Sequence, residues 1–342
     1  MIYTYSYYPS DADKLNDFVM AYFNRIEFET GDFSIDFFEK EFYDNLVSRH
    51  KGILLKPFMQ IYETTKTWRQ PKRTKLCNSI RESNKIEEIC EGKIVFTDFS
   101  DIPSTLTEIL IKLFKQLYKD VLFGKYFKSH YGDRKNHYHN FIKHKKNELD
   151  WCPSCGIRPM HRFTDDITEQ YDHYLPKDLY PFSSVNFQNL VPICNDCNSL
   201  QVKKDDDILA HTGKVFYPFD ETHKPIEIAI SIATNNSDIE KVKWKITYTC
   251  QEGKSKELSA WKKIYKIEDR HQKHCVGSIK SWYKKYWDNI NDGDLIADQP
   301  DEIKRKNAYL KSKKDNQFEQ KCLSVIIPDK RALRESLIAS RY

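Results

Sequence analysis

The chain carries two cysteine pairs, in Trp151-Cys152-Pro153-Ser154-Cys155-Gly156 and in Pro192-Ile193-Cys194-Asn195-Asp196-Cys197-Asn198. Two thiolates at this spacing reach one ion from a tight turn, and two such turns supply the four soft ligands that tetrahedral zinc prefers. Gly156 provides the backbone freedom that the first turn needs. The spacing therefore predicts a structural zinc ion on Cys152, Cys155, Cys194 and Cys197, with unlinked thiols or a redox pair as the alternative.

The segment between the cysteine pairs contains polar residues that suit hydrolytic chemistry. It includes Tyr171-Asp172-His173 and Asn189-Leu190-Val191-Pro192, and Asn198 follows the second pair directly. An imidazole, with a reference pKa near ~6.5, is the side chain best suited to take a proton from water at neutral pH. The pattern predicts a strand, a loop, a second strand and then a helix that begins at 194–198.

This combination of motifs resembles the HNH endonuclease family, which has the ββα-metal fold, in a version with asparagine at the last histidine position. The resemblance covers residues 151–207 and says little about the rest of the chain. It implies that His173 is the general base and that Asn189 braces the loop and orients the histidine. It also implies that Asp172 and Asn198 hold a catalytic Mg²⁺ or Mn²⁺ ion.

Less specific interpretations of the same residues stay open. His173 could be a structural or zinc-binding histidine and Asp172 a turn residue, and the unit could keep its zinc clamp without turnover. Asn198 is a weaker ligand than histidine, which leaves the choice of metal undecided. Three lysines beside the motif are predicted to contact DNA phosphates, although solvated lysines are common: Lys177, Lys203 and Lys204.

Composition indicates a globular protein without a membrane span. The 342 residues are 39% hydrophobic and 31% charged, and no run approaches the ~18 apolar residues of a membrane helix. Residues 1–8 lack the basic region and the apolar core of a secretory signal, so we expect a cytoplasmic location. The formal net charge is +5, from 55 Lys and Arg against 50 Asp and Glu, which permits a nucleic-acid partner without arguing for one.

The patterns predict an α+β protein with three domains. Residues 1–150 are expected to form a mainly helical domain, because apolar residues recur at three- and four-residue spacing in 15–26 and 106–122. Residues 151–210 are predicted to form the zinc-stabilised HNH unit. Residues 211–342 are predicted to form a small antiparallel sheet plus helices.

Individual elements follow from the same spacing rules. A long amphipathic helix is predicted from Ser259 onward, with further helices at about 299–323 and 329–341. The basic interval 66–93 is consistent with an exposed loop or with a short helical insertion. Short strands are predicted at 215–219, 226–232 and 241–248.

The stretch from Lys125 to Lys146 mixes cations with aromatic residues just before the first cysteine pair. Such a mixture suits phosphate neutralisation combined with base or sugar stacking. A solvated helix face explains it almost as well.

The predicted function is that of a metal-dependent endonuclease that hydrolyses DNA phosphodiester bonds. Long HNH-like chains of this kind resemble nucleases of prokaryotic anti-phage defence or mobile elements, in which a partner ATPase or sensor protein controls cleavage. Two copies acting together would suit double-strand breaks, because one such site cuts one strand at a time. The alternatives are a zinc-stabilised module that binds nucleic acid or a partner without turnover, and an RNA nuclease.

Overall fold

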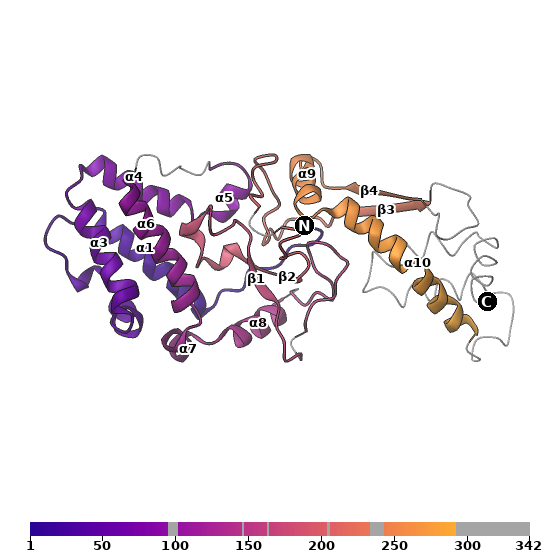
Figure 1. Ribbon diagram of the computed structural model, residues 1–342, viewed down its shortest axis with the longest axis horizontal. Coiled ribbons are helices and arrows are strands. Elements are labelled where there is room, and N and C mark those ends of the chain that lie inside the picture. Colours follow the sequence, from indigo (N-terminus) through magenta and orange to yellow (C-terminus); the bar gives the residue numbers. More distant parts are fainter. Residues whose placement is uncertain (95–101, 146, 163, 204–205, 233–242, 292–342) are drawn as a thin grey trace. The chain divides into compact units, whose positions relative to one another are not determined.

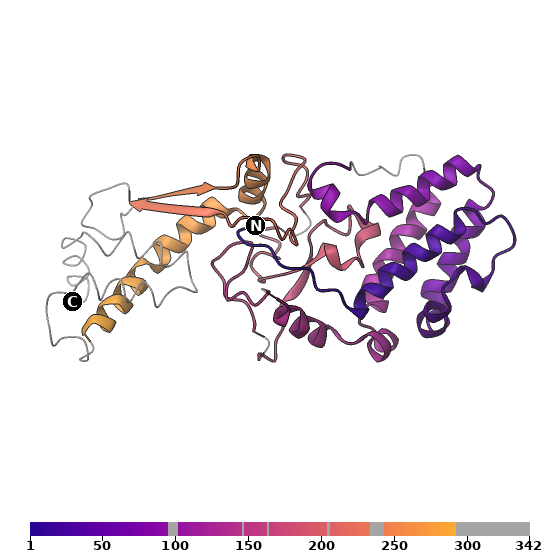
Figure 2. The same cartoon turned by 180° about the vertical axis from the view of Figure 1, so that it is seen from behind.

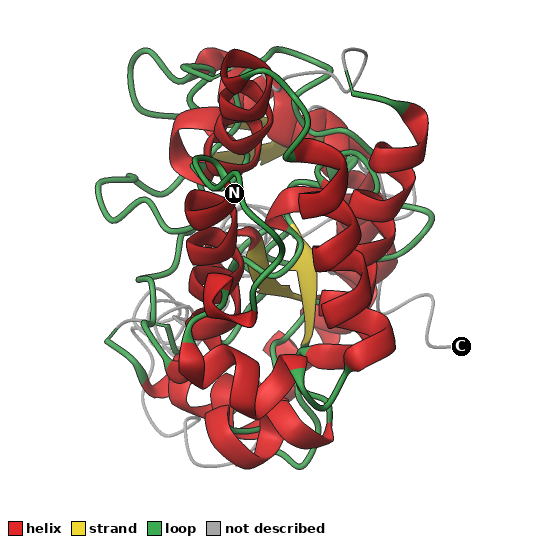
Figure 3. Cartoon of the chain, turned by 90° about the vertical axis from the view of Figure 1, so that its left-hand side faces the viewer, coloured by secondary structure: helices red, strands yellow, loops and turns green. Residues whose placement is uncertain are grey.

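The computed structural model describes residues 1–94, 102–145, 147–162, 164–203, 206–232 and 243–291 (Figure 1). Its many helices and two antiparallel strand pairs confirm the predicted α+β class (Figure 3). The chain forms two compact units. We call residues 4–148 and 161–222 the helical unit, and the described parts of 1–3, 149–160 and 223–291 the ribbon unit.

The helical unit begins with α1 (Lys14–Ile26), which is entered through the 3-10 turn η1 (Asp11–Asp13). Ser10 and Asp13 form a capping box, which satisfies backbone N–H groups at the start of the helix. The apolar residues of α1 fall on one face at helical spacing and are all buried. The prediction of this stripe is confirmed for Leu15, Phe18, Val19, Tyr22, Phe23 and Ile26.

The rest of the helical unit consists of short helices, 3-10 or π-helical turns and one pair of strands. In chain order these are η2 (Ile35–Phe37), α2 (Lys40–Phe42), η3 (Tyr43–Val47), η4 (Lys51–Leu55), α3 (Lys56–Thr65), α4 (Gln70–Glu82), α5 (Ile86–Cys90), α6 (Ser104–Gln116), η5 (Leu117–Val121), α7 (Lys125–Tyr131), α8 (Arg134–Lys143), β1 (Gln170–His173), η6 (Pro181–Ser183), η7 (Phe187–Asn189) and β2 (Leu190–Ile193).

Aromatic side chains fill the core between these helices. The Phe23 ring of α1 stacks 6.2 Å from that of Phe114 of α6, and the Tyr22 ring lies 4.5 Å from that of Phe58 of α3. Rings of this size bury large apolar areas, so they supply most of the stability of such a bundle. Figures 1 and 2 show α3 and α6 side by side from opposite directions.

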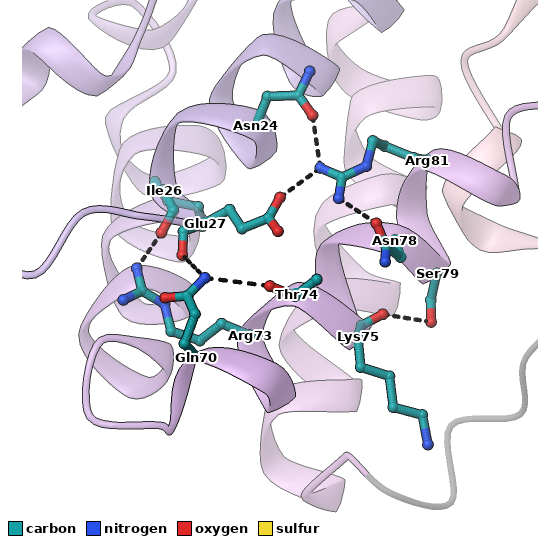
Figure 4. A network of polar contacts seen from close by, with 10 residues as sticks. All are labelled: Asn24, Ile26, Glu27, Gln70, Arg73, Thr74, Lys75, Asn78, Ser79 and Arg81. Carbon is teal, nitrogen blue, oxygen red and sulfur yellow. Dashed lines mark hydrogen bonds and ion pairs between the residues drawn. The ribbon is translucent and has the colours of Figure 1, made fainter.

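The basic interval 66–93 is helical, which decides between the two alternatives left by the sequence. It forms α4 and α5, and α4 is fixed to the end of α1 by a polar network (Figure 4). Arg81 donates to Glu27 Oε2 at 2.7 Å and to Asn24 Oδ1 at 2.9 Å, while the buried Arg73 donates to the carbonyl of Ile26. Cations near the last carbonyls of a helix oppose its dipole favourably, so the positive charges of this interval are partly structural.

The ribbon unit contains the strands β3 (Glu227–Ile232) and β4 (Trp244–Thr249), followed by α9 (Ser255–Ile264) and α10 (Ile267–Asn291). The strands pair antiparallel, with Ile228 opposite Tyr248, and the predicted strands at 226–232 and 241–248 are confirmed in their described parts. Figures 1 and 2 show α10 running beside this ribbon. Gln272 of α10 donates to the carbonyl of Trp244 at 2.8 Å.

Outside the cysteine-flanked segment, two local predictions are wrong. The helix predicted from Ser259 is two helices, because the chain turns at Tyr265–Lys266 and Lys266 has a left-handed φ of 49°. Residues 215–219 form no strand; they are buried without a ladder, and the amide of Val215 donates to the carbonyl of Cys90. The helices predicted at 299–323 and 329–341 lie outside the described residues. Among the described helices, none has the length and apolar character to cross a membrane.

Candidate metal centre and hydrolytic site

The first cysteine pair lies in a tight hairpin of the ribbon unit. A bridge between Trp151 and Pro159 closes it, and the amide of Gly156 donates to the carbonyl of Cys152 at 2.7 Å. Gly156 has a φ of 65°, and a Cβ there would lie 2.9 Å from Cδ1 of Ile2. The positive φ favours glycine at this position, as the sequence predicted for the first turn, whereas the end of the Ile2 side chain could move aside.

Two helices of the ribbon unit hold the carbonyls of this hairpin. Trp261 of α9 donates its indole N–H to the carbonyl of Ser154 at 2.7 Å, and Nε2 of His271 of α10 lies 2.8 Å from the carbonyl of Cys155. A carbonyl only accepts, so Nε2 of His271 carries the hydrogen and Nδ1 accepts from the hydroxyl of Tyr248 at 3.0 Å. The helical spacing of Trp261 and His271 predicted only a buried stripe; their role in holding the cysteine hairpin has no sequence signature.

The second cysteine pair follows β2 directly. Its turn is closed by the amide of Asn198, which donates to the carbonyl of Cys194 at 3.1 Å. The chain continues in turns through the described residues up to 203. The helix predicted to begin here is therefore absent, and the segment is not the complete strand, strand and helix arrangement that the resemblance implied.

The four predicted cysteines come together. Cys152, Cys155, Cys194 and Cys197 are buried, none forms a disulfide, and their sulfur atoms all lie within 4.8 Å of one another. Four bonds of about 2.3 Å from a tetrahedral zinc ion place the sulfur atoms about 3.8 Å apart. This donor set fits zinc after a small contraction, and it would supply a structural site because all four positions are taken by protein.

Strand β1 carries Asp172 and His173, and β2 begins directly after Asn189. The two strands pair antiparallel, with Asp172 opposite Val191 and His173 opposite Leu190. Successive side chains of a strand point to opposite faces. This alternation explains why Asp172 and His173, although adjacent in the sequence, contact different neighbours.

His173 is buried and held by a backbone carbonyl. The side chain is 8% exposed, its Nε2 lies 2.9 Å from the carbonyl oxygen of Ser184, and its ring centroid lies 4.3 Å from that of Tyr118. The carbonyl accepts, so Nε2 carries the hydrogen and the lone pair is on Nδ1, to which none of the described residues bonds. Burial lowers the pKa of His173 to about 3, which keeps the ring neutral at pH 7.

Asn189 braces the loop that follows His173 at two points. Its Oδ1 accepts from the amide of Leu175 at 2.7 Å, and its Nδ2 donates to the carbonyl of Leu175 at 3.0 Å and to Oγ of Ser183 at 3.2 Å. Leu175 lies two residues after His173, and Ser183 precedes the residue whose carbonyl holds the imidazole. The fully buried carboxamide thus has the contacts expected of a residue that orients the histidine.

Asp172 forms an ion pair with Lys203. The ammonium of Lys203 lies 3.0 Å from Oδ1 and 2.8 Å from Oδ2 of Asp172, and it donates to the carbonyl of His173 at 2.8 Å. The two side chains are 4% and 0% exposed. The prediction that Lys203 contacts phosphate at the surface is therefore wrong, because its ammonium is buried and neutralised by Asp172.

The ion pair of Asp172 disfavours the predicted catalytic Mg²⁺ or Mn²⁺ ion on Asp172 and Asn198. Both carboxylate oxygens of Asp172 face the ammonium of Lys203, which repels a second cation. Asn198 is half-buried, and none of the contacts described for it reaches Asp172. No step of the chemistry is assigned to a divalent ion at these residues.

Of the other two lysines predicted to contact phosphate, only Lys177 lies among the described residues. Lys177 is half-buried, and its charge acts on the imidazole of His173. Lys204 lies outside the described residues.

Acid is expected to destabilise the fold around β1 through His137. This residue of α8 is 8% exposed, and its Nδ1 lies 2.5 Å from the hydroxyl of Tyr171 of β1. Burial lowers its pKa to about 4, so as the pH falls below about 6.5 the unfolded chain binds a proton before the folded chain does. The free energy of unfolding should therefore drop by about 2 kcal/mol between about pH 7 and pH 5 through this residue alone.

Urea unfolding of the wild type and of His137→Gln at both pH values measures this effect. Glutamine keeps a hydrogen-bonding group toward Tyr171 and does not titrate. Between the two pH values, the free energy of unfolding of the variant should therefore drop by about 2 kcal/mol less than that of the wild type. Equal losses in the two proteins would show that His137 is not responsible.

Comparisons with known proteins add no relatives: no family model, no curated protein and no solved structure matches the chain.

Proposed function

We propose that this protein is a phosphodiester hydrolase, an HNH-type endonuclease that cuts DNA with His173 as its base. The observation that carries the proposal is the contact between Nε2 of His173 and the carbonyl of Ser184 at 2.9 Å. It selects one tautomer and leaves the lone pair of Nδ1 to accept a proton from an attacking water. The structural His271 is fixed by a carbonyl in the same way, but its Nδ1 is taken by Tyr248, whereas none of the described residues bonds to Nδ1 of His173.

The bracing by Asn189 supports the same proposal. Its contacts with Leu175 and Ser183 fix two points of the loop that leads from His173 to the Ser184 carbonyl. A base must be held within hydrogen-bond reach of its water, so rigid support of this loop serves catalysis. In this proposal Asn189 is a positioning residue, and the four cysteines stabilise the segment on which the site is built.

Plasmid cleavage in the presence of Mg²⁺ or Mn²⁺ tests the proposal, since the resemblance implies a divalent ion. The wild type should cut, and His173→Ala should lose about 10²- to 10⁴-fold of the rate while zinc content and circular dichroism stay unchanged. His211→Ala, at an exposed histidine, is the matched control and should keep full activity. Unchanged cleavage by His173→Ala would remove the base from the mechanism, and RNA tested in parallel decides the substrate.

The closure of the site favours a second candidate, a zinc-stabilised nucleic-acid-binding module without turnover. His173 is only 8% exposed, its ring is covered by Tyr118, and Asp172 is paired with Lys203. A buried histidine beside a buried ion pair also suits a purely structural role. Binding of DNA without cleavage under any of the tested ions would support this candidate over the nuclease.

A further inference from the structure

An open cavity of about 890 Å³ lies against the β1–β2 pair within the helical unit. We call it the Tyr118 groove. Its lining includes Tyr118 and Lys119 of η5, Arg134 at the start of α8, Tyr171 of β1 and Leu190 of β2. Gly124 shapes the turn between η5 and α7, since a Cβ there would lie 2.6 Å from the carbonyl oxygen of Asp120.

The groove has more positive than negative charge. Two of its cations are neutralised, since Lys128 lies 3.5 Å from Asp133 and Lys135 lies 3.1 Å from Asp166. The remaining cations, Lys119 and Arg134, are exposed, and neither forms an ion pair with any residue that the structure describes. A concave surface with two unneutralised cations attracts anions.

One aromatic ring separates this groove from His173. Tyr118 lines the groove and also packs against the imidazole, with ring centroids 4.3 Å apart and an interplanar angle of 66°. Burial raises the pKa of the Tyr118 hydroxyl, and the charge of Arg134 opposes that rise, so the guanidinium acts on this ring. Leu190, which lines the groove, is the register partner of His173.

We propose that the Tyr118 groove binds the sugar-phosphate backbone of a DNA strand, with Lys119 and Arg134 on the phosphates and Tyr118 against a base or sugar. Cations beside an aromatic ring that lines a groove are the combination that binds single strands without sequence preference, and the half-buried Tyr118 lines this one. A strand in the groove would lie one side chain away from His173, and this link to cleavage rests on the proposed hydrolase. Within the basic stretch 125–146, the proposal names Arg134 as a DNA contact. It adds Tyr118 and Lys119 from η5.

Fluorescence anisotropy with labelled single-stranded DNA of about 20 nucleotides, longer than the ~4–16 of typical single-strand sites, tests the groove. All proteins carry His173→Ala, so that cleavage does not disturb the binding curves. Lys119→Ala/Arg134→Ala should weaken binding at least about 10-fold and reduce the slope of log affinity against log salt by about 1.4, for two lost phosphate contacts. Lys51→Ala/Lys56→Ala removes two exposed lysines outside the groove and should leave both quantities unchanged.

The ring is tested separately from the charges. Tyr118→Phe keeps the ring and should bind like its parent, whereas Tyr118→Ala should bind roughly 5- to 100-fold more weakly. Zinc content and circular dichroism verify that each variant is folded.

The outcomes separate this inference from the proposed function. Affinity and salt slope unchanged in Lys119→Ala/Arg134→Ala overturn the groove, even if His173-dependent cleavage is observed. Loss of binding in that variant, with no cleavage by the wild type, supports the groove and removes the hydrolase.

Discussion

Replacing Cys197 with alanine is expected to abolish zinc binding and to unfold the segment that carries the proposed site. Structural zinc contributes about 10 kcal/mol or more of apparent folding free energy in zinc-finger peptides. A whole domain is stable by only about 5–15 kcal/mol. The free energy lost with the metal should therefore equal or exceed most of the free energy of unfolding of this part of the chain.

The arrangement of the thiols explains why such a large effect is expected. The four sulfur atoms are buried within 4.8 Å of one another. Thiolates gathered so closely repel one another in a medium of low dielectric unless a cation lies between them. Removing one thiolate leaves three ligands, which lowers zinc affinity, and removing the zinc leaves buried sulfur atoms with no compensating charge.

Metal content and thermal unfolding measure the prediction. Wild-type protein should contain one zinc per chain, and Cys197→Ala should contain little zinc and show a much lower Tm or no cooperative transition. Cys77→Ala is the matched control, since Cys77 is also buried but lies in α4 outside the cluster; it should keep its zinc and lose about 1 kcal/mol. A wild type that purifies without zinc, or a Cys197→Ala protein that keeps one, would contradict a structural zinc site.

Sequence patterns predicted those features in which neighbours along the chain carry the signal. The apolar stripe of α1 follows from three- and four-residue spacing, and the β3–β4 ribbon follows from period-two alternation. The cysteine cluster follows from a spacing that only a shared ion explains well. In each case local geometry determines the result, so the pattern and the structure agree.

Predictions were wrong or incomplete where the local structure depends on a backbone group or on a residue far away in the sequence. A helix of good amphipathic spacing is broken at Lys266 by one left-handed residue, and nothing in the composition of that segment marks it. The group that orients His173 is the carbonyl of Ser184, and a backbone atom has no sequence signature. Tyr118 was part of a predicted buried stripe, yet it lines a groove on one side and covers His173 on the other.

Lys203 is the clearest of these failures and gives the second large prediction. Its partner Asp172 is 31 residues away in the chain, so no local pattern separates this lysine from a solvated one. Lys203→Met should lower the free energy of unfolding by about 3–5 kcal/mol, because it leaves the carboxylate of Asp172 buried without the ammonium that neutralises it. Asp172→Asn should cost a similar amount for the opposite reason, since the ammonium then lies buried beside a neutral amide.

The double variant Asp172→Asn/Lys203→Met distinguishes a mutual ion pair from two independent roles. Removing both charges removes the uncompensated one, so most of the stability should return and the coupling energy should reach several kcal/mol. Lys115→Met is the control, because Lys115 pairs with Asp178 at 2.7 Å where both side chains are about half exposed, and it should cost less than about 1 kcal/mol. Urea unfolding of the four proteins and the wild type measures the cycle. A Lys203→Met protein no less stable than Lys115→Met, or a double variant as unstable as the sum of the singles, would mean that Asp172 does not depend on Lys203 for its charge compensation.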